Sequence, residues 1–425
     1  MIPIISQNEN TELLTKLIQR TQFDFNRINA VVEEIVGNVK KYKDDAVRKY
    51  TNAFDGIDIK DFKVSQKEID DAFLRIDPKL EGYLKKALEN IKGYHQKQMI
   101  NSFTIEKEKG IMLGQIVKPI DTVGIYVPGG TASYPSTVLM NAVPAKIAGV
   151  KRLVMVTPPN KEGKIKDSIL VAAKLAGVDE IYKVGGAQGI AALTYGTETI
   201  PKVHKIVGPG NIYVAIAKRL VSGYVGIDMI AGPSEVLIIA DGQANPDYIA
   251  ADLMAQAEHD VLAASILLTN SMELAKKVQA SIEKQIDQLE RKKIINDSLS
   301  NYGAIVITSS LDASINIANQ LAPEHLEILT EKPLEVLEKI ENAGAIFLGE
   351  YTPEPVGDYF AGPNHTLPTS GTARFASALS TLDFLKKTSV VSYDKDALRE
   401  ASEAIIGLAN EEGLTAHANA IKIRF

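Results

Sequence analysis

The chain has 425 residues, of which 45% are hydrophobic and 24% charged, with a formal net charge of -6 and no cysteine. This length exceeds the usual size of one domain, so we expect two or more domains with sizeable cores. The negative charge argues against nucleic acid as a partner. The lack of cysteine excludes disulfides, thiolate metal sites and a catalytic thiol.

The amino-terminal sequence MIPIISQNENTELL has no basic segment followed by an apolar one, which a secretory signal would have. No apolar stretch approaches the roughly 20 residues that are needed to cross a bilayer. We therefore expect a cytoplasmic protein without a membrane partner.

Apolar residues at three- and four-residue spacing predict a helical region from Leu13 to about Ile100. From Asp121 on, segments of helical spacing alternate with short β-branched runs, namely TVGIYV, RLVMVT, EIYKVG, HKIVG and EVLIIAD. Further strands are predicted at residues 264–269, 304–308, 326–329 and 345–348. After about Thr372 the pattern is helical again, and residues 401–419 resemble an amphipathic docking tail. This order predicts parallel βαβ units in two α/β layers.

Four glycine-rich segments interrupt the predicted α/β region, at residues 127–131, 184–189, 207–211 and 231–235. Most of them follow a predicted strand. Turns at the carboxyl ends of parallel strands bind ligands, and glycine lets the backbone approach a ligand closely. Any one segment also fits an ordinary turn, but the four together favour a ligand site.

The segment AQAEHD, residues 255–260, continues a predicted helix and places Gln256 and His259 on one helical face. Amide oxygen and imidazole nitrogen are ligands that suit zinc and related divalent ions. The alternative is a helical histidine that packs or hydrogen-bonds without binding a metal. The spacing alone does not decide between the two.

The segment LAPEHL, residues 321–326, places Glu324 and His325 after a helix ended by Pro323 and just before a strand. We expect this junction to expose both side chains at a sheet edge. Adjacent side chains on an extended segment point in different directions, so the two would act at separate places rather than hydrogen-bond each other. The alternative is an exposed polar turn.

The segment GDYFAGPNHTLP, residues 357–368, is dense in glycine, proline and polar residues, as functional loops are. Asp358 and His365 are candidate metal ligands there, although both residue types also form turns. The chain lacks a G-x-G-x-x-G after a strand, a Walker A motif, H-E-x-x-H and G-x-S-x-G. No such fingerprint therefore identifies a cofactor.

In their order along the chain, these segments resemble the histidinol dehydrogenase family. The most specific match is IDMIAGPSEVLI at residues 227–238, followed at the family's spacing by AQAEHD, APEHLE, GDYFAGPNHTLPT and EGLTAHANAI. The resemblance covers essentially the whole chain. It implies the oxidation of L-histidinol to L-histidine through L-histidinal, which ends histidine biosynthesis, with two NAD reduced and one water consumed.

The resemblance also implies the architecture. We expect an α/β fold of two incomplete Rossmann-like parallel-sheet domains, with a helical N-terminal arm and a small helical C-terminal domain exchanged across a homodimer. The arm would cover residues 1–20, and the NAD-binding α/β domain residues 119–237. The first α/β domain would be discontinuous, at residues 21–118 and 238–372, and residues 373–425 would form a tail docked on the partner subunit.

The site residues that the resemblance implies fall into three groups. The ligands of one zinc per subunit, with the last supplied by the partner subunit, would be Gln256, His259, Asp358 and His417. The substrate contacts would be Ser234, Gln256, His259, His325, Asp358, Glu412 and His417. The NAD contacts would be Tyr126, Gln188 and Asn211.

The two catalytic candidates have residue types that suit separate steps. Imidazole, with an ordinary pKa of about 6.5, suits His325 to take the hydroxyl proton of the alcohol. With no cysteine to form a thioester, water must attack the aldehyde, and we expect Glu324 to activate it. The resemblance implies that zinc orients the substrate. A metal-dependent hydrolase of small amides or esters, and a noncatalytic binding protein, are the alternatives.

Overall fold

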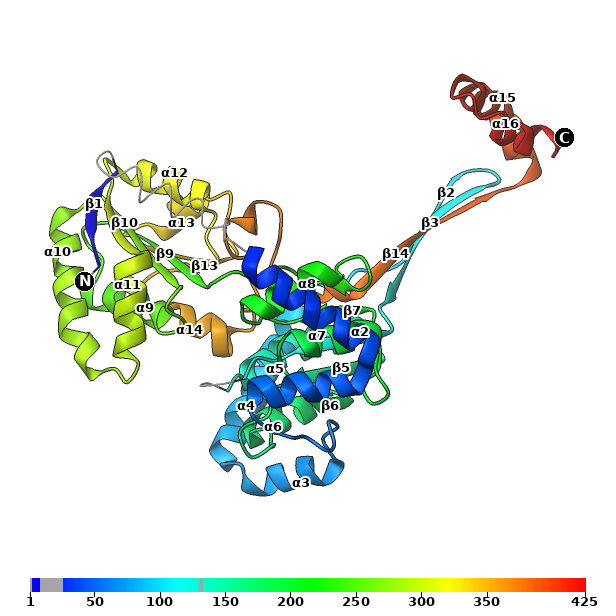
Figure 1. Ribbon diagram of the computed structural model, residues 1–425. Coiled ribbons are helices and arrows are strands. Elements are labelled where there is room, and N and C mark those ends of the chain that lie inside the picture. The colour runs from blue at the N-terminus through cyan, green and yellow to red at the C-terminus, as the bar shows by residue number, and fades with distance from the viewer. Residues whose placement is uncertain (1, 8–25, 130–132) are drawn as a thin grey trace.

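The computed structural model describes residues 2–7, 26–129 and 133–425 and contains two parallel sheets, each covered by helices on both faces, and a long antiparallel ribbon (Figure 1). Most of the expected N-terminal arm, Leu13 as the start of the predicted helical region, and Gly130 and Thr131 of the first glycine-rich segment lie outside the described residues. Within the described ranges, no helix has both the length and the apolar character to span a membrane.

The first sheet has six parallel strands in the order β1-β11-β10-β9-β12-β13. Their bounds are Ile4–Ser6, Gly303–Ile307, Ala264–Thr269, Glu235–Ala240, His325–Leu329 and Ala345–Leu348. Along β9, Val236 and Ile238 face one core and Leu237 and Ile239 face the other. Both faces are covered, which explains why these strands are nearly continuous apolar runs.

Helices of alternating βα units supply the two covering layers of this sheet. One face packs against α9 (Pro246–Ala257), α10 (Met272–Gln285) and α11 (Lys292–Tyr302). The other packs against α12 (Leu311–Leu321) and α13 (Pro333–Leu337). The turn η1 (Ile286–Gln288) links α10 to the segment before α11. The predicted second α/β layer is therefore present.

The second sheet has five parallel strands in the order β6-β5-β4-β7-β8. Their bounds are Glu180–Lys183, Arg152–Thr157, Thr122–Tyr126, Lys205–Val207 and Gly226–Ile227. One face is covered by α3 (Gln66–Arg75), α4 (Pro78–Gln96), α5 (Pro135–Ala148) and α6 (Asp167–Leu175). The other is covered by α2 (Asn26–Asp55), α7 (Gly186–Tyr195) and α8 (Ile212–Val221).

The packing of the early helices differs from the expected division of the chain. Residues 26–96 share their cores with the five-stranded sheet, whereas the resemblance grouped residues 21–118 with residues 238–372. Val32 and Val36 of α2, for example, lie in one apolar cluster with Tyr126 of β4. The six-stranded sheet also begins before residue 238, because β9 starts at Glu235.

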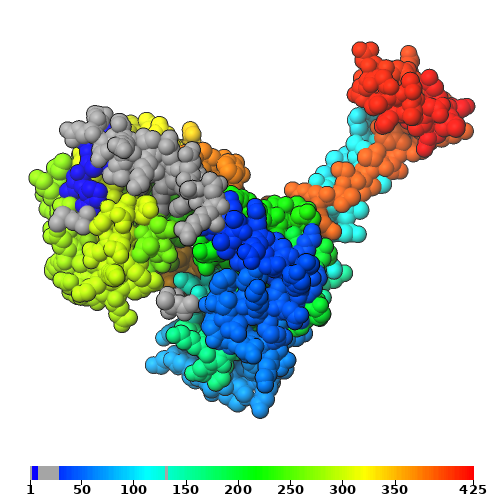
Figure 2. All heavy atoms as spheres, viewed as in Figure 1, coloured from blue at the N-terminus to red at the C-terminus, as the bar shows by residue number. Residues whose placement is uncertain are grey.

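An antiparallel ribbon carries the C-terminal helices away from both sheets (Figures 1 and 2). It consists of β2 (Phe103–Glu108), β3 (Ile111–Pro119) and β14 (Leu385–Tyr393), with β3 in the middle. At its tip lie α15 (Lys395–Glu411) and α16 (Thr415–Lys422). The expected helical tail is present, but the ribbon was not predicted.

Short elements complete the region between β13 and the ribbon. They are α14 (Glu354–Val356), the π-helical turn η2 (Gly357–Ala361), and the turns η3 (Thr372–Arg374) and η4 (Thr381–Phe384). The segment 357–368, expected to be a loop, therefore begins with a helical turn. Phe384 of η4 is fully buried in the core of the five-stranded sheet, so this region crosses from one sheet to the other.

Candidate functional site

The Glu324–His325 pair lies where the chain enters β12. Helix α12 ends at Leu321, and Ala322 takes the left-handed conformation with φ 49°, so the chain turns through Pro323 into the strand. Glu324 is 6% exposed and His325 is 3% exposed. The expected exposure at a sheet edge is wrong, because β12 pairs with β9 on one side and β13 on the other.

The backbone of Glu235, the first residue of β9, holds both members of the pair. Its N–H donates to Glu324 Oε2 over 2.9 Å, and its carbonyl oxygen lies 3.0 Å from His325 Nδ1. A carbonyl oxygen only accepts, so the ring proton of neutral His325 is on Nδ1. His325 Nδ1 and Glu324 Oε2 are 3.8 Å apart, beyond hydrogen-bonding distance.

The other ring nitrogen of His325, Nε2, is the unprotonated one in this tautomer. It is buried and has no hydrogen-bond partner among the described residues. Two carboxylates lie near it, with Glu354 Oε1 and Asp358 Oδ1 each 3.8 Å away. The lone pair of Nε2 is therefore free to accept a proton from a molecule bound beside these two carboxyl groups.

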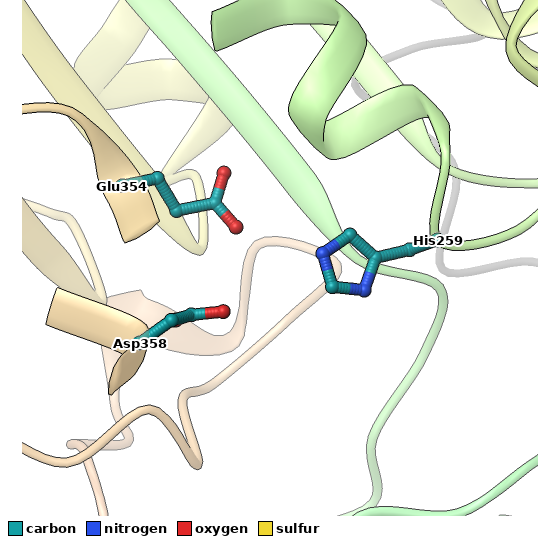
Figure 3. A group of neighbouring side chains, drawn as sticks. All are labelled: His259, Glu354 and Asp358. Carbon is teal, nitrogen blue, oxygen red and sulfur yellow. The ribbon is translucent and has the colours of Figure 1, made fainter. Parts of the chain in front are cut away.

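Three side chains around this space converge in the manner of a metal site. His259, Glu354 and Asp358 each offer a ligand atom, and these atoms lie within 4.8 Å of one another. Figure 3 shows the three side chains pointing toward a common centre. Imidazole nitrogen with carboxylate oxygen is a donor set that suits zinc and related divalent ions.

Gln256 and His259 reach this centre from the carboxyl end of α9. The helix ends at Ala257, so the expectation that it continues through His259 is wrong. His259 lies in the turn that follows, and its N–H donates to the Gln256 carbonyl oxygen over 3.2 Å. Helical spacing predicted that Gln256 and His259 lie close together, and the turn keeps them close.

The Gln256 side chain is fully buried, and its neighbours determine how its amide is oriented. Its nitrogen faces Glu354 Oε2 at 3.2 Å and the Glu235 carbonyl oxygen at 3.3 Å. His325 Nδ1 also lies 3.3 Å away, but that nitrogen carries the proton given to Glu235. The amide protons of Gln256 therefore go to the two oxygens, which leaves its own oxygen free to bind a cation.

Burial dominates the electrostatics of this site. It raises the pKa of the Glu324 carboxyl to about 8, despite the opposing effects of His325 and the Glu235 N–H. Burial, and then the Asp358 and Asp252 carboxylates, raise the pKa of Glu354 well above its usual range. Burial also lowers the pKa of His259, which favours the neutral ring that binds metals. A cation at this centre would offset the mutual repulsion of the acids.

His365, the other candidate ligand of the 357–368 segment, is occupied by hydrogen bonds at both nitrogens. Its Nδ1 donates to the Asp358 carbonyl oxygen over 3.0 Å, and its Nε2 lies 3.2 Å from Thr137 Oγ1. The ring is thus a support that fixes the Asp358 backbone rather than a free ligand. Burial lowers the pKa of His365, so the ring is neutral near neutral pH.

The expected NAD contacts lie together at the carboxyl ends of strands in the five-stranded sheet. Tyr126 ends β4, Gln188 lies in the first turn of α7 after β6, and Asn211 caps α8 after β7. The Tyr126 hydroxyl accepts from the Gly186 N–H over 3.1 Å, and burial raises the pKa of Tyr126 to about 12. Tyr126 therefore keeps its proton and can donate it to a ligand.

Gln188 and Asn211 offer complementary groups beside Tyr126. Gln188 Oε1 is buried and has no hydrogen-bond partner within the described ranges, so it is an available acceptor. Asn211 Oδ1 accepts from the N–H groups of Tyr213 and Val214 at 3.1 and 3.2 Å, which leaves its amide nitrogen as the available donor. These groups suit the hydroxyls and amide of a dinucleotide.

Of the remaining expected residues, one lies beside the site and two lie in the helical region at the tip of the antiparallel ribbon. Ser234 directly precedes Glu235 at the start of β9. Glu412 and His417 are exposed at the tip of the ribbon, which Figure 1 shows well away from α9 and α14. Within one chain, the structure does not bring them to His259 and Asp358. Their supply by a partner subunit stays a prediction.

Two residues of the site were not found from the sequence. Glu354 lies at the start of α14 and is 2% exposed. A glutamate between two prolines shows no sign of burial in its sequence, so composition offered no signal for it. Glu235 acts through its backbone N–H and carbonyl, which every non-proline residue has.

Comparisons with known proteins agree on one family. The sequence model of the family described as histidinol dehydrogenase matches residues 18–425. A histidinol dehydrogenase of Clostridium acetobutylicum is 58% identical over 394 residues, which cover 93% of this chain and 91% of that protein. One from Bacillus cereus is 53% identical over 417 residues, which cover 98% of this chain and 95% of that protein.

A solved structure extends this agreement to the fold. The crystal structure of histidinol dehydrogenase from Elizabethkingia anophelis superposes with a TM-score of 0.94 at 39% identity. The match covers 100% of this chain and 98% of that chain. On the family match and these identities, the chain belongs to the histidinol dehydrogenase family.

Proposed function

We propose that this chain oxidises L-histidinol to L-histidine through L-histidinal, reducing two NAD and consuming one water, as the last step of histidine biosynthesis. Membership of the family and the names of its relatives support this reaction. The observation that carries the proposal is the His325 ring, whose proton is fixed on Nδ1 and whose buried Nε2 has no partner within the described part of the chain.

His325 is the base for the alcohol step. Hydride can leave the carbinol carbon only as the hydroxyl proton is removed, and Nε2 is the group in position to accept that proton. The Nδ1 proton, held by the Glu235 carbonyl oxygen, keeps the ring oriented and stabilises the imidazolium that forms. Asp358 Oδ1, 3.8 Å from Nε2, favours that positive charge.

Glu324 is the base for the aldehyde step. The chain has no cysteine, so a hydrated aldehyde replaces a thioester as the species that gives up the second hydride. Glu324 accepts a proton from the attacking water with one carboxyl oxygen while the Glu235 N–H holds the other. Its pKa of about 8 lies close to working pH, which suits a general base.

The residue types of the partly buried donor set at the end of α9 suit a zinc ion. Gln256, His259 and Asp358 would hold it, and His417 of the partner subunit would complete the set. When bound, zinc fixes the imidazole and amine of the substrate in one orientation. Glu354 accepts an amide proton of Gln256 and so leaves the Gln256 oxygen available as a ligand.

The NAD site would be built by Tyr126, Gln188 and Asn211. When bound, NAD accepts the hydride. Tyr126 and Asn211 supply donors and Gln188 an acceptor, all beside the carboxyl ends of β4, β6 and β7. This position agrees with the general location of dinucleotides in parallel α/β sheets.

We further propose a cytoplasmic homodimer in which α15 and α16 dock on the partner subunit. Large apolar side chains are exposed here, among them Leu408 of α15 at 69% and Ile423, directly after α16, at 75%. Exposed apolar side chains at the tip of an extended arm are typical of a surface that a second chain covers.

The test is the stoichiometry of the complete reaction. The purified protein, supplied with zinc, L-histidinol and excess NAD, should form two NADH for each histidinol consumed, with L-histidine as the product. Removal of the metal with a chelator should abolish the reaction, and zinc should restore it. Absence of NADH, together with hydrolysis of small amides or esters in NAD-free buffer, would replace the proposal with a hydrolase.

A further inference from the structure

A buried ion pair beside the proposed NAD site has no part in the chemistry described above. Lys218 of α8 and Asp228, which follows β8, are in direct contact, and their side chains are 2% and 1% exposed. Burying two charges costs free energy, and replacing such a pair by apolar residues is often neutral or stabilising. Stability alone therefore does not explain why the pair is there.

Both members of the pair bind the same residue, Gly208. Asp228 Oδ2 accepts from the Gly208 N–H over 2.8 Å, and Lys218 Nζ donates to the Gly208 carbonyl oxygen over 2.9 Å. Asp228 Oδ1 also accepts from the Met229 N–H over 2.6 Å. The two charged side chains thus fix both polar groups of Gly208, directly after β7.

Gly208 itself is pressed against the strand that carries Tyr126. Its backbone φ angle is +113°, a value that residues other than glycine rarely adopt. A Cβ at this position would lie 2.1 Å from the Tyr126 carbonyl oxygen. The backbone of the turn after β7 therefore approaches the end of β4 more closely than any residue with a side chain would allow.

Asn211 takes its position from this turn. It begins α8 three residues after Gly208, and its Oδ1 is already bound to the first N–H groups of that helix. Its amide nitrogen can reach a ligand only if the turn carries it to the right place. Lys218 lies on the same helix, so the pair links the turn, the helix and the segment that leaves the sheet at Asp228.

We propose that Lys218 and Asp228 are positioning residues for NAD, and that they hold the Gly208–Asn211 turn so that Asn211 and Tyr126 face the same part of the cofactor. The proposal rests on the proposed NAD site. It predicts that the pair affects cofactor binding and leaves the zinc and histidinol site unchanged, because that site belongs to the other sheet.

The test is the double variant Lys218→Met with Asp228→Asn, which removes both charges together and leaves no unpaired buried ion. NADH binding, followed by nucleotide fluorescence, should weaken about tenfold, the change that about 1.4 kcal/mol produces. The KM for NAD should rise by a similar factor, while kcat at saturating NAD stays within about twofold of wild type. Binding of L-histidine to the zinc-loaded enzyme should be unchanged.

The matched control is Lys205→Met, which breaks a partly buried pair with Asp383 at the opposite, amino end of β7. It should leave NADH binding unaltered. Should the double variant not fold, Lys218→Gln with Asp228→Asn is the milder test, because it also leaves no unpaired buried charge and the glutamine amide can still donate to the Gly208 carbonyl oxygen. That variant should show the same NAD-selective loss in smaller measure.

The outcomes separate this inference from the proposed function. If folded variants bind NADH as wild type does, the pair is not a positioning device, although the dehydrogenase proposal stands. If NADH and L-histidine binding weaken equally, the effect is general loss of structure and the inference is wrong. If the wild-type protein itself binds no NADH, the proposed function fails.

Discussion

His325 donates its Nδ1 proton to the carbonyl oxygen of Glu235, 3.0 Å away on the neighbouring strand β9. The orientation of the base is therefore set by a strand backbone, which side-chain substitutions around the site leave in place. The N–H of Glu235 holds Glu324 Oε2 at the same time. One residue thus directs both catalytic candidates, and each keeps a free atom for its own proton transfer.

Replacing His325 by asparagine removes the atom that accepts the hydroxyl proton. We expect kcat for L-histidinol to fall by about 10² to 10⁴, the usual contribution of a positioned base, with little change in KM. Steady-state NADH formation measures this. His204→Asn, which changes an exposed histidine just before β7, is the matched control and should behave as wild type. A proportional rise in KM would instead assign His325 to binding.

Replacing Glu324 by glutamine should separate the two oxidations. The alcohol step depends on His325, whereas the aldehyde step needs the carboxylate that activates water. In a single turnover with enzyme in excess, we expect the first NADH to form at close to the wild-type rate and the second to be slower by about 10² or more. Rapid-quench detection of L-histidinal would verify the stalled intermediate. Equal slowing of both phases would contradict the separate roles.

Glu354→Gln should weaken the metal without removing a proposed ligand. Glu354 Oε2 accepts a hydrogen bond from the amide nitrogen of Gln256. A glutamine at position 354 can turn its own NH2 group toward that nitrogen, and the hydrogen bond is then lost. Loss of such a supporting contact typically costs about 10- to 100-fold in metal affinity. Competition with a chromogenic chelator measures the zinc Kd. Glu350→Gln, an exposed acid on the same connection, is the control and should leave the Kd unchanged.

Much of the fold was predictable because buried parallel strands leave a clear apolar signal. Three strands were predicted with their observed bounds, residues 152–157, 264–269 and 345–348. The antiparallel ribbon was missed for the converse reason. Every residue of β2 is exposed, so its side chains have no buried face within the chain that would impose an alternating pattern. The packing of α2 on the five-stranded sheet depends on tertiary contacts, which helical spacing does not report.

The candidate site was predictable in its residue types and in the position of Glu324 and His325 before a strand, but not in its burial. Ligands were expected at the carboxyl ends of strands, and the residues expected to contact NAD are at such ends. Glu324 and His325 lie at the amino end of β12, just before the strand as expected, beside Glu235 at the amino end of β9. Burial of Glu354 and of the Glu324–His325 pair follows from strand order, and no residue-level motif encodes that order.

The buried acids predict an unusual pH dependence of stability in the metal-free protein. Burial raises the pKa of Glu324 from 4.5 to about 8, so the folded chain keeps a proton that the unfolded chain has lost across that range. The free energy of unfolding should therefore fall as pH rises from about 4.5 to about 8. In Glu324→Gln the fall should be shallower, as measured by urea unfolding across that interval. Parallel profiles would show that Glu324 does not titrate with a raised pKa.

Complementation between inactive chains tests whether His417 serves the partner subunit. A mixed dimer of His259→Asn and His417→Asn has one site that lacks both ligands and one that keeps all of them. Equal mixing makes half of the dimers mixed, so co-refolding should restore about one quarter of wild-type activity. The control is His259→Asn with Asp358→Asn, whose changes fall in separate sites and leave none intact. If His417 acts in its own subunit, each chain of the first mixture carries a damaged site, and neither mixture should recover activity.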